Sequence, residues 1–191
     1  MWPLFELRAC PDGGRLARDH QPATGGSMTK HIDTVDQYSA STDEIWSMLQ
    51  DQAYWDAKYA ALGATNLEWL EFTPAGDTLK VSSVRHVVAN LPAAAKKIIG
   101  ETAEVTQTEQ WTRSGDELSA SITVNTKGAP GGFTGSSTIS PSDAGSSWST
   151  HFDIKISIPL LGKKLESAAY DETGDNFIKE KGFNDEWLSE H

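Results

Sequence analysis

Two polar residues in the middle of the chain, Gln107 and Glu109, are spaced so that they could bring chemistry into the interior of a protein. They share the parity of Val105 and Trp111, and a period of two is typical of a β-strand with one buried face. The parity that buries Val105 and Trp111 turns both polar side chains inward. A buried carboxylate is costly unless it has a hydrogen-bond donor, a wet cavity or a proton. The pair is therefore a candidate anchor for a ligand, and Glu109 is a candidate general acid or base.

A structural role is the alternative for Glu109. Its carboxylate would then bond to Arg85, to Tyr59 or to a backbone amide, or it would face water in a different register. Arg85 and His86 are weaker candidates, because their strand has no clear parity and either residue could point inward. The sequence leaves these alternatives open.

Known catalytic and metal-binding patterns are absent from the sequence. It contains no Gly-x-Ser-x-Gly, no His-Glu-x-x-His and no glycine-rich phosphate loop. The histidines are scattered: His20 and His191 lie near the termini, and strand parity turns His151 outward. Because Cys10 is the only cysteine, neither an internal disulfide nor a cysteine-based zinc site is available. We expect no metal site and no cofactor.

Aromatic residues of the predicted strands and helices form either the walls of a pocket or an ordinary core. Pockets for small molecules combine such walls with a few polar groups. The aromatic candidates are Trp69, Trp111, Phe133, Trp148, Phe152 and Trp187. The full set of candidate ligand-binding residues is Tyr59, Trp69, Arg85, Gln107, Glu109, Trp111, Ile122, Phe133, Phe152, Glu172 and Asn176.

The elements that must position these residues are clearest at the C-terminus. Residues 148–158 alternate between apolar and polar side chains, which predicts a strand, and Pro159 ends it. A proline-free helix is predicted from Leu161 to Ser189, about 43 Å long at roughly 1.5 Å per residue. Such a helix could cross the whole face of a sheet.

Two orientations of this helix are open. One stripe has large apolar groups at its ends and small or polar ones at its centre, which would leave a space under the helix: Leu161, Leu165, Ala168, Ala169, Glu172, Asn176, Phe183 and Trp187. Alternatively, Gly174 and Gly182 bend or rotate the helix so that Tyr170 and Phe177 face inward.

The remaining pattern predicts an antiparallel sheet with two short helices near its start. After a first strand at 31–38, Ser41 and Glu44 form a capping box, and Asp51 caps a second helix that Gly63 ends. Strands follow at 67–73, 79–88, 102–112, 118–125 and 133–139, mostly joined by hairpin turns. Residues 90–100 are predicted to form a short helical loop. The sheet must bury one face, and only the C-terminal helix is long enough to cover it.

Composition narrows the class of protein. The 191 residues suit one domain, and 16 basic against 27 acidic residues give a net charge of −11, which disfavours nucleic acid as a partner. No apolar run reaches the length of a membrane span. The single cysteine fits a cytoplasmic protein. Residues 1–27 differ in pattern from the rest and are predicted to be a disordered extension of a domain at 28–191.

The order of elements resembles the helix-grip fold of the START and plant-allergen-like (SRPBCC) superfamily, which also includes polyketide cyclases and aromatases. Several stretches are similar to a bacterial family of uncharacterised domains within it: Tyr38–Ser41 with Glu44–Trp46, Leu91-Pro92, Gly100–Thr102 with Gln107–Trp111, Pro130-Gly131, and Lys155–Pro159 with Leu161–Glu166. The resemblance spans about Met28 to Leu188. It implies a curved sheet wrapped round the long helix and a pocket for an apolar or amphipathic molecule.

Three functions remain open at this point. The first is non-catalytic binding of a hydrophobic or amphipathic small molecule such as a lipid, polyketide or aromatic metabolite. The second is a cyclase or aromatase reaction in which Glu109 with Gln107, or His86, polarises a carbonyl. The third is a protein-interaction domain or homodimer that uses Tyr170, Phe177 and Leu188 of the last helix.

Overall fold

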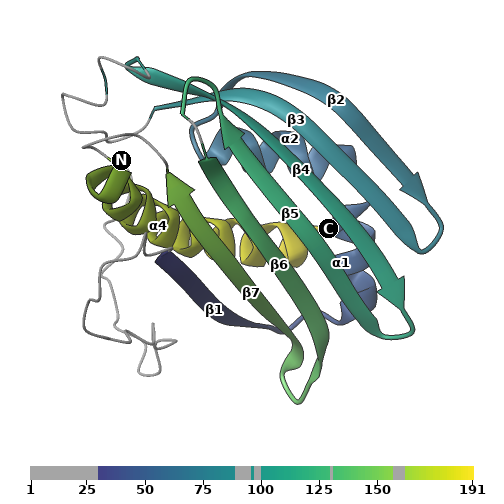
Figure 1. Cartoon of the computed structure of the whole chain (residues 1–191). Helices are drawn as coiled ribbons and strands as arrows, with labels where there is room; N and C mark the ends of the chain where they lie inside the picture. Colours follow the sequence, from purple (N-terminus) through teal and green to yellow (C-terminus); the bar gives the residue numbers. More distant parts are fainter. Residues whose placement is uncertain (1–29, 89–95, 97–99, 130, 157–161) are drawn as a thin grey trace, which may run out of the picture.

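Seven strands form one antiparallel sheet that curves round a long C-terminal helix. The computed structural model describes residues 30–88, 96, 100–129, 131–156 and 162–191. The strand order is β1-β7-β6-β5-β4-β3-β2, so the first and last strands of the chain are neighbours and β1 and β2 are the edges. Figure 1 shows the strands from β2 to β7 following one another as a meander.

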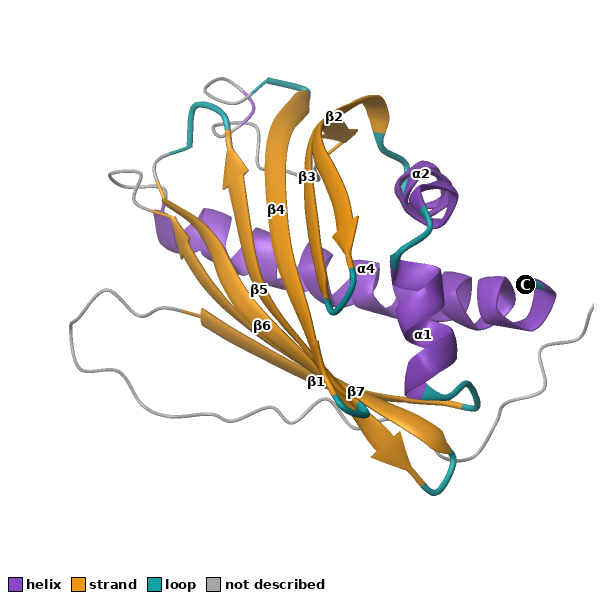
Figure 2. Cartoon of the chain, turned by 90° about the vertical axis from the view of Figure 1, so that its right-hand side faces the viewer, coloured by secondary structure: helices purple, strands orange, loops and turns teal. Residues whose placement is uncertain are grey.

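The elements are short at the start of the chain and long at its end. Their bounds are β1 Lys30–Tyr38, α1 Thr42–Leu49, α2 Gln52–Ala61, β2 Thr65–Ala75, β3 Thr78–Val88, β4 Thr102–Ser114, β5 Glu117–Thr126, β6 Gly131–Ser142, β7 Gly145–Ile156 and α4 Gly162–Glu190. In Figure 2, α4 lies across the concave side of the sheet, and α1 and α2 stand beside its C-terminal half. This is the helix-grip architecture that the sequence predicts.

Local sequence explains where the two short helices begin. The Ser41 hydroxyl accepts a hydrogen bond from the Glu44 amide at 3.2 Å, and the Glu44 carboxylate accepts one from the Ser41 amide at 2.7 Å. This is the predicted capping box of α1. The Asp51 side chain caps α2 by accepting from the Ala53 amide at 2.9 Å.

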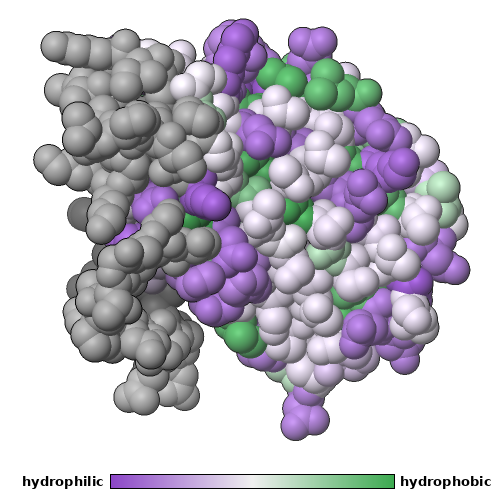
Figure 3. All heavy atoms as spheres, viewed as in Figure 1, coloured by the Kyte–Doolittle hydropathy of each residue, from purple (hydrophilic) through white to green (hydrophobic). Residues whose placement is uncertain are grey.

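The sheet buries one face, as the alternation of its residues predicts. Inward-facing residues of the central and C-terminal strands include Leu79, Trp111, Leu118, Ile139 and Ile154, each no more than 2% exposed. They form one core with the apolar faces of α1 and α2. The opposite face of the sheet, which Figure 3 views directly, is mostly intermediate in hydropathy, with hydrophilic patches and scattered apolar side chains.

Gly135 lets an aromatic ring lie flat on the inner face of the sheet. It pairs with Phe152 across β6 and β7, and a Cβ at this position would lie 2.6 Å from the His151 carbonyl oxygen and 2.8 Å from the Phe152 ring. A real side chain does not fit in that space. The glycine therefore helps to place Phe152 under α4.

Some predicted features lie outside the described residues. These are the extension at 1–27, most of the loop at 90–100, Ile158 with Pro159, and Leu161; the side chain of Leu165 is likewise not described. Among the described residues, no helix combines the length and the apolar character needed to cross a membrane.

Candidate functional site

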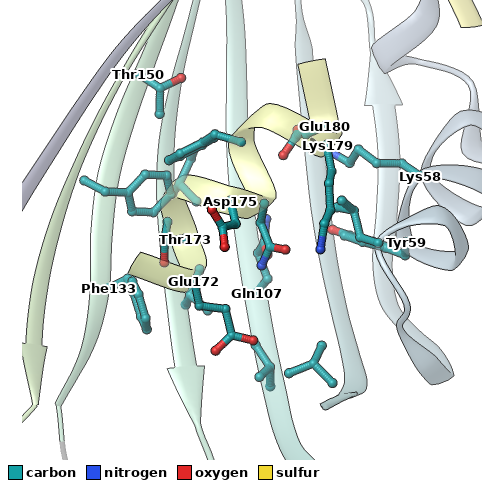
Figure 4. Close-up of a pocket in the computed structure, with 18 of the residues that line it drawn as sticks. Lys58, Tyr59, Gln107, Phe133, Thr150, Glu172, Thr173, Asp175, Lys179 and Glu180 are labelled. Atoms are coloured by element: carbon teal, nitrogen blue, oxygen red, sulfur yellow. Dashed lines mark hydrogen bonds and ion pairs between the residues drawn. The ribbon is translucent and has the colours of Figure 1, made fainter. Parts of the chain in front are cut away.

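A cavity of about 660 Å³ lies between the concave face of the sheet, α2 and α4. Its size is within the range of about 300–1,000 Å³ that is usual for small-molecule sites. Figure 4 shows its three walls: Phe133 and Gln107 come from strands, Tyr59 and Lys58 from α2, and Glu172, Asp175 and Lys179 from α4.

The apolar wall is formed by the inward residues of β4 to β7 and by two small residues of α4. It consists of Ala103, Val105, Trp111, Ile122, Val124, Phe133, Trp148 and Phe152 with Ala168, Ala169 and Phe177. Phe177 packs on Phe152 with the ring centroids 5.8 Å apart. These side chains give the cavity a large surface that favours an apolar molecule.

A chain of hydrogen bonds forms a polar strip on β3 and β4. The Arg85 guanidinium donates to the Gln107 carbonyl oxygen at 2.5 Å, and the Gln107 amide donates to Glu109 Oε1 at 2.5 Å. The Trp111 indole donates to Glu109 Oε2 at 2.8 Å. The strip thus links Arg85, Gln107, Glu109 and Trp111 in one continuous chain of contacts.

Glu109 is satisfied by its own strand. Its side chain is 4% exposed, and each carboxylate oxygen accepts one hydrogen bond. The sequence anticipated Arg85 or Tyr59 as the partner, but the donors are Gln107 and Trp111, and Arg85 is connected only through Gln107. These two hydrogen bonds hold the carboxylate against β4, which is a structural role of the kind that the sequence left open.

Tyr59 has the one buried polar side-chain atom without a hydrogen-bond partner among the described residues. The residue is 2% exposed, and its hydroxyl points from α2 toward the cavity (Figure 4). Ser83 lies near the hydroxyl, where hydrogen bonding to it acts to lower the pKa of Tyr59, but the two groups do not meet hydrogen-bond geometry. Burial raises the pKa of Tyr59, so the hydroxyl is a neutral donor. The Arg85 guanidinium lies 4.1 Å from the centre of the Tyr59 ring.

The polar part of the α4 wall carries both acidic and basic side chains. Asp171, Glu172 and Asp175 lie on it together with Lys179, Glu180 and Lys181. Across from it, burial raises the pKa of Asp36, while the charge of Lys181 acts in the opposite direction. The cavity therefore has an apolar sheet side and a charged helix side, which is the environment of an amphipathic molecule.

Three polar contacts hold the C-terminal half of α4 in place. Lys58, 4% exposed, pairs with Glu180 at 3.1 Å. Burial alone would lower the pKa of Lys58, but Glu180 keeps it above its ordinary value. The Tyr54 hydroxyl donates to Asn184 at 2.8 Å, and Asn184 donates to the Tyr38 hydroxyl at 3.2 Å. These contacts join α2, α4 and β1.

The sequence analysis missed these anchors. A signal for one of them was present, because Lys58 is placed at helical spacing from Tyr54 and beside Tyr59 on the apolar face of α2. No comparable signal marked Asn184, whose partners are 130 and 146 residues away in the sequence.

A family model described as "Protein of unknown function (DUF2505)" matches residues 33–188. The chain belongs to the DUF2505 family. The match covers all the described strands and helices that line the cavity, apart from the first residues of β1 and the end of α4.

Solved structures show that this DUF2505 chain has the START-like helix-grip fold. The protein TTHA0849 from Thermus thermophilus is 13% identical with a TM-score of 0.60, over 83% of this chain and 97% of its own. A START superfamily protein from Mycobacterium smegmatis is 14% identical with a TM-score of 0.53, over 83% and 98%. The Zhui aromatase/cyclase from Streptomyces sp. R1128 is 14% identical with a TM-score of 0.51, over 81% and 93%. No curated protein matches significantly.

Most of the predicted site residues of the DUF2505 chain come together in the cavity. The residues that line it are Tyr59, Arg85, Gln107, Glu109, Trp111, Ile122, Phe133, Phe152, Glu172 and Asn176. The parity of β3 is now clear: Arg85 points inward, whereas His86 lies outside the cavity and faces Glu104 at 3.6 Å.

Trp69 corrects the prediction, because it does not line the cavity. Its indole donates to Asp56 of α2 at 2.9 Å, and its ring packs against Tyr59 and Phe72. The register of β2 shifts on both sides of Glu68 and Trp69, which defeats a simple count of inward positions. Trp69 therefore packs against the Tyr59 ring from outside the cavity.

The two predicted orientations of α4 are both partly realised. Ala168, Ala169, Glu172 and Asn176 line the cavity, as the first stripe predicts, and Phe177 lines it as well. The proposed dimer stripe of Tyr170, Phe177 and Leu188 packs against the core of the DUF2505 domain. All three side chains are partly buried, and the homodimer stays a prediction.

Proposed function

We propose that this protein binds an amphipathic small molecule, mainly apolar, in the cavity between the sheet and α4, without catalysing its conversion. The observation that carries the proposal is the unpartnered Tyr59 hydroxyl beside the polar strip of a cavity whose sheet wall beyond that strip is mainly aromatic and aliphatic. A buried hydroxyl without a partner costs about 1–3 kcal/mol, and a bound acceptor would recover that cost.

The polar strip indicates which end of the ligand is recognised. Tyr59 and Arg85 present donors at the α2 side of the cavity, whereas the wall from Ile122 to Phe152 is apolar. We infer that a carbonyl, carboxylate or phenolic oxygen lies near Tyr59 and that the hydrocarbon or aromatic part extends over β5 to β7. Lipids, polyketides and aromatic metabolites all have this division.

A cyclase or aromatase reaction has less support. Both oxygens of Glu109 are occupied within β4, and His86 lies outside the cavity. Binding without turnover is therefore the proposal, and the location of the protein in the cytoplasm remains a prediction from its single cysteine.

Native mass spectrometry of the full chain tests this function. We expect an added mass, from the expression host or from a panel of fatty acids, polyketides and flavonoids, that is lost on denaturation. The variant Val124→Trp places an indole in the cavity and should reduce occupancy at least tenfold. The matched control Thr123→Trp, on the exposed face of the same strand, should not. Equal uptake by both variants, or no uptake by the unchanged protein, would overturn the proposal.

A further inference from the structure

The sheet face opposite the cavity carries two His-x-Asp tripeptides side by side. One begins at His31 on β1 and the other at His151 on β7. The antiparallel register places each histidine opposite the aspartate of the other tripeptide, so that His31 pairs with Asp153 and Asp33 pairs with His151. The middle residue of each tripeptide is buried. Strand alternation therefore puts all four polar side chains on the outer face.

Three of these side chains converge on one point. His31 Nδ1 contacts Asp153 Oδ1, and His151 Nε2 lies 3.2 Å from the same oxygen. One ligand atom from each of the three residues lies within 4.8 Å of the other two. The two imidazole rings are stacked with their centroids 5.8 Å apart, so both present a nitrogen on the same side.

Two imidazole nitrogens and a carboxylate oxygen are ligands that divalent transition metals prefer. Zn²⁺ binds such atoms at about 2.0–2.2 Å and accepts three protein ligands with water in the fourth position. Ligand atoms around a shared ion at those distances lie about 3–3.5 Å apart, close to the spacing of His151 Nε2 and Asp153 Oδ1. Since the three side chains are partly exposed, small rotations would complete the geometry.

The fourth residue, Asp33, orients the His151 side chain. Asp33 Oδ1 lies 2.7 Å from His151 Nδ1. With an ion bound, a carboxylate there would keep the proton on Nδ1, so that the Nε2 lone pair points to the ion between His151 and Asp153. Metal-ligating histidines usually have an outer partner of this kind, which fixes the tautomer and the ring.

We propose that His31, His151 and Asp153 bind one divalent transition-metal ion of the Zn²⁺ type, with Asp33 as the residue that orients His151. The ion links the edge strand β1 to its neighbour β7 on the outer face, where the first and last strands of the chain pair. This site is separate from the ligand cavity and does not depend on the proposed function.

The same face provides a matched control. His86 on β3 also faces a carboxylate across the ladder, with its Nε2 3.6 Å from Glu104, but it has no second histidine or aspartate grouped with it among the described residues. A His–carboxylate pair alone should not hold the ion, because a single imidazole and one carboxylate leave most of its coordination to water.

Isothermal titration calorimetry of the full chain, stripped with a chelator, tests the site. We expect one Zn²⁺ per chain and no comparable binding of Mg²⁺, which prefers oxygen ligands. The double variant His31→Ala/His151→Ala should weaken Zn²⁺ binding by more than a hundredfold, and Asp33→Asn by about 10- to 100-fold. His86→Ala should leave the affinity unchanged.

A second measurement uses the unchanged protein, in case the variants fail to fold. Nitrogen-15 spectra of the histidine rings should show Zn²⁺ shifting the resonances of His31 and His151 while those of His86 stay in place. Zn²⁺ binding that persists in the folded double variant would overturn the site, since Cys10, His20 or His191 would then supply the ligands. Histidine spectra without a selective shift, or the absence of Zn²⁺ binding, would overturn it equally.

Discussion

Tyr54 and Tyr59 are both buried tyrosines of α2, but their hydroxyls have opposite surroundings. The Tyr54 hydroxyl donates to Asn184, whereas the Tyr59 hydroxyl has no partner among the described residues. The same chemical change at the two positions therefore separates a structural hydroxyl from one that is available to a ligand. Each substitution with phenylalanine removes a single oxygen and keeps the ring contacts.

We expect Tyr59→Phe to keep or raise the free energy of unfolding, by up to about 1–3 kcal/mol, because it removes a buried unsatisfied group. Tyr54→Phe should lower it by about 1–2 kcal/mol, because Asn184 loses its donor. Urea unfolding of the ligand-free proteins measures both. Ligand affinity should fall in Tyr59→Phe only, and an equal loss of stability in the two variants would contradict this account.

Glu109 is expected to matter first for stability. In Glu109→Gln the side-chain NH₂ would face either the Gln107 amide or the Trp111 indole, both of which are donors. One charge-assisted hydrogen bond is lost inside the core, at a cost of about 1.5–3 kcal/mol. Thermal unfolding checks this. A variant with an unchanged melting temperature but weaker ligand binding would instead make Glu109 a direct ligand contact.

At the scale of elements, helix α1 depends on a charged cap. Hydrogen bonds from Ser41 lower the pKa of Glu44 below its ordinary value of 4.5. A carboxyl with a lowered folded pKa contributes stability above its unfolded pKa and loses that contribution as the pH falls through the folded pKa. The unchanged protein should therefore lose part of its stability below about pH 4.5.

The variant Glu44→Gln should remove this part of the pH dependence. Its melting temperature should be lower than that of the unchanged protein at pH 7 and should converge with it in acid. The exposed Glu68 on β2 provides the control. The melting temperature of Glu68→Gln should equal that of the unchanged protein at both pH values. Melting curves at pH 7 and pH 3 test this prediction. A difference in melting temperature between Glu44→Gln and the unchanged protein that is the same at both pH values would contradict the capping role.

Elements whose signals are local could be predicted from the sequence. The capping box, the hairpin turns and the inward parity of Gln107, Glu109 and Phe152 all depend on residues a few positions apart, and the structure agrees with them. Trp69 could not be placed, because a shift of register in β2 breaks the period of two. A bulge has no dependable sequence signal.

At the scale of the whole molecule, the missed features all depend on distant partners. The pairing of β1 with β7 brings His31 beside His151, although the sequence shows only scattered histidines. Likewise, the contacts of Asn184 with Tyr38 and Tyr54 follow from where α4 crosses the sheet. Composition and periodicity describe single elements. Contacts between residues far apart in the sequence could therefore be found only in the folded structure.

Helix α4 holds the sheet and α2 together. Removing one partner of its buried ion pair with Lys58 should show how much that pair contributes to stability. In Glu180→Gln the Lys58 ammonium, enclosed by Trp55 and Tyr59, would remain charged without a counterion. Breaking a buried pair from one side costs about 3–5 kcal/mol, and we expect the lower end because Glu180 is 25% exposed.

Replacing both partners should restore most of that loss, because Lys58→Met with Glu180→Gln removes both charges of the pair and keeps the side-chain volume. Urea unfolding of the two single variants and the double variant forms a thermodynamic cycle whose coupling energy isolates the pair. The part of α4 that lines the cavity runs from Ala168 to Asn184 and includes both Glu180 and Phe177, whose ring packs on Phe152. If the pair holds α4 over the cavity, Glu180→Gln should also release a bound ligand faster. Additive effects of the two single substitutions, with an unchanged release rate, would show that the aromatic contacts hold α4 without the ion pair.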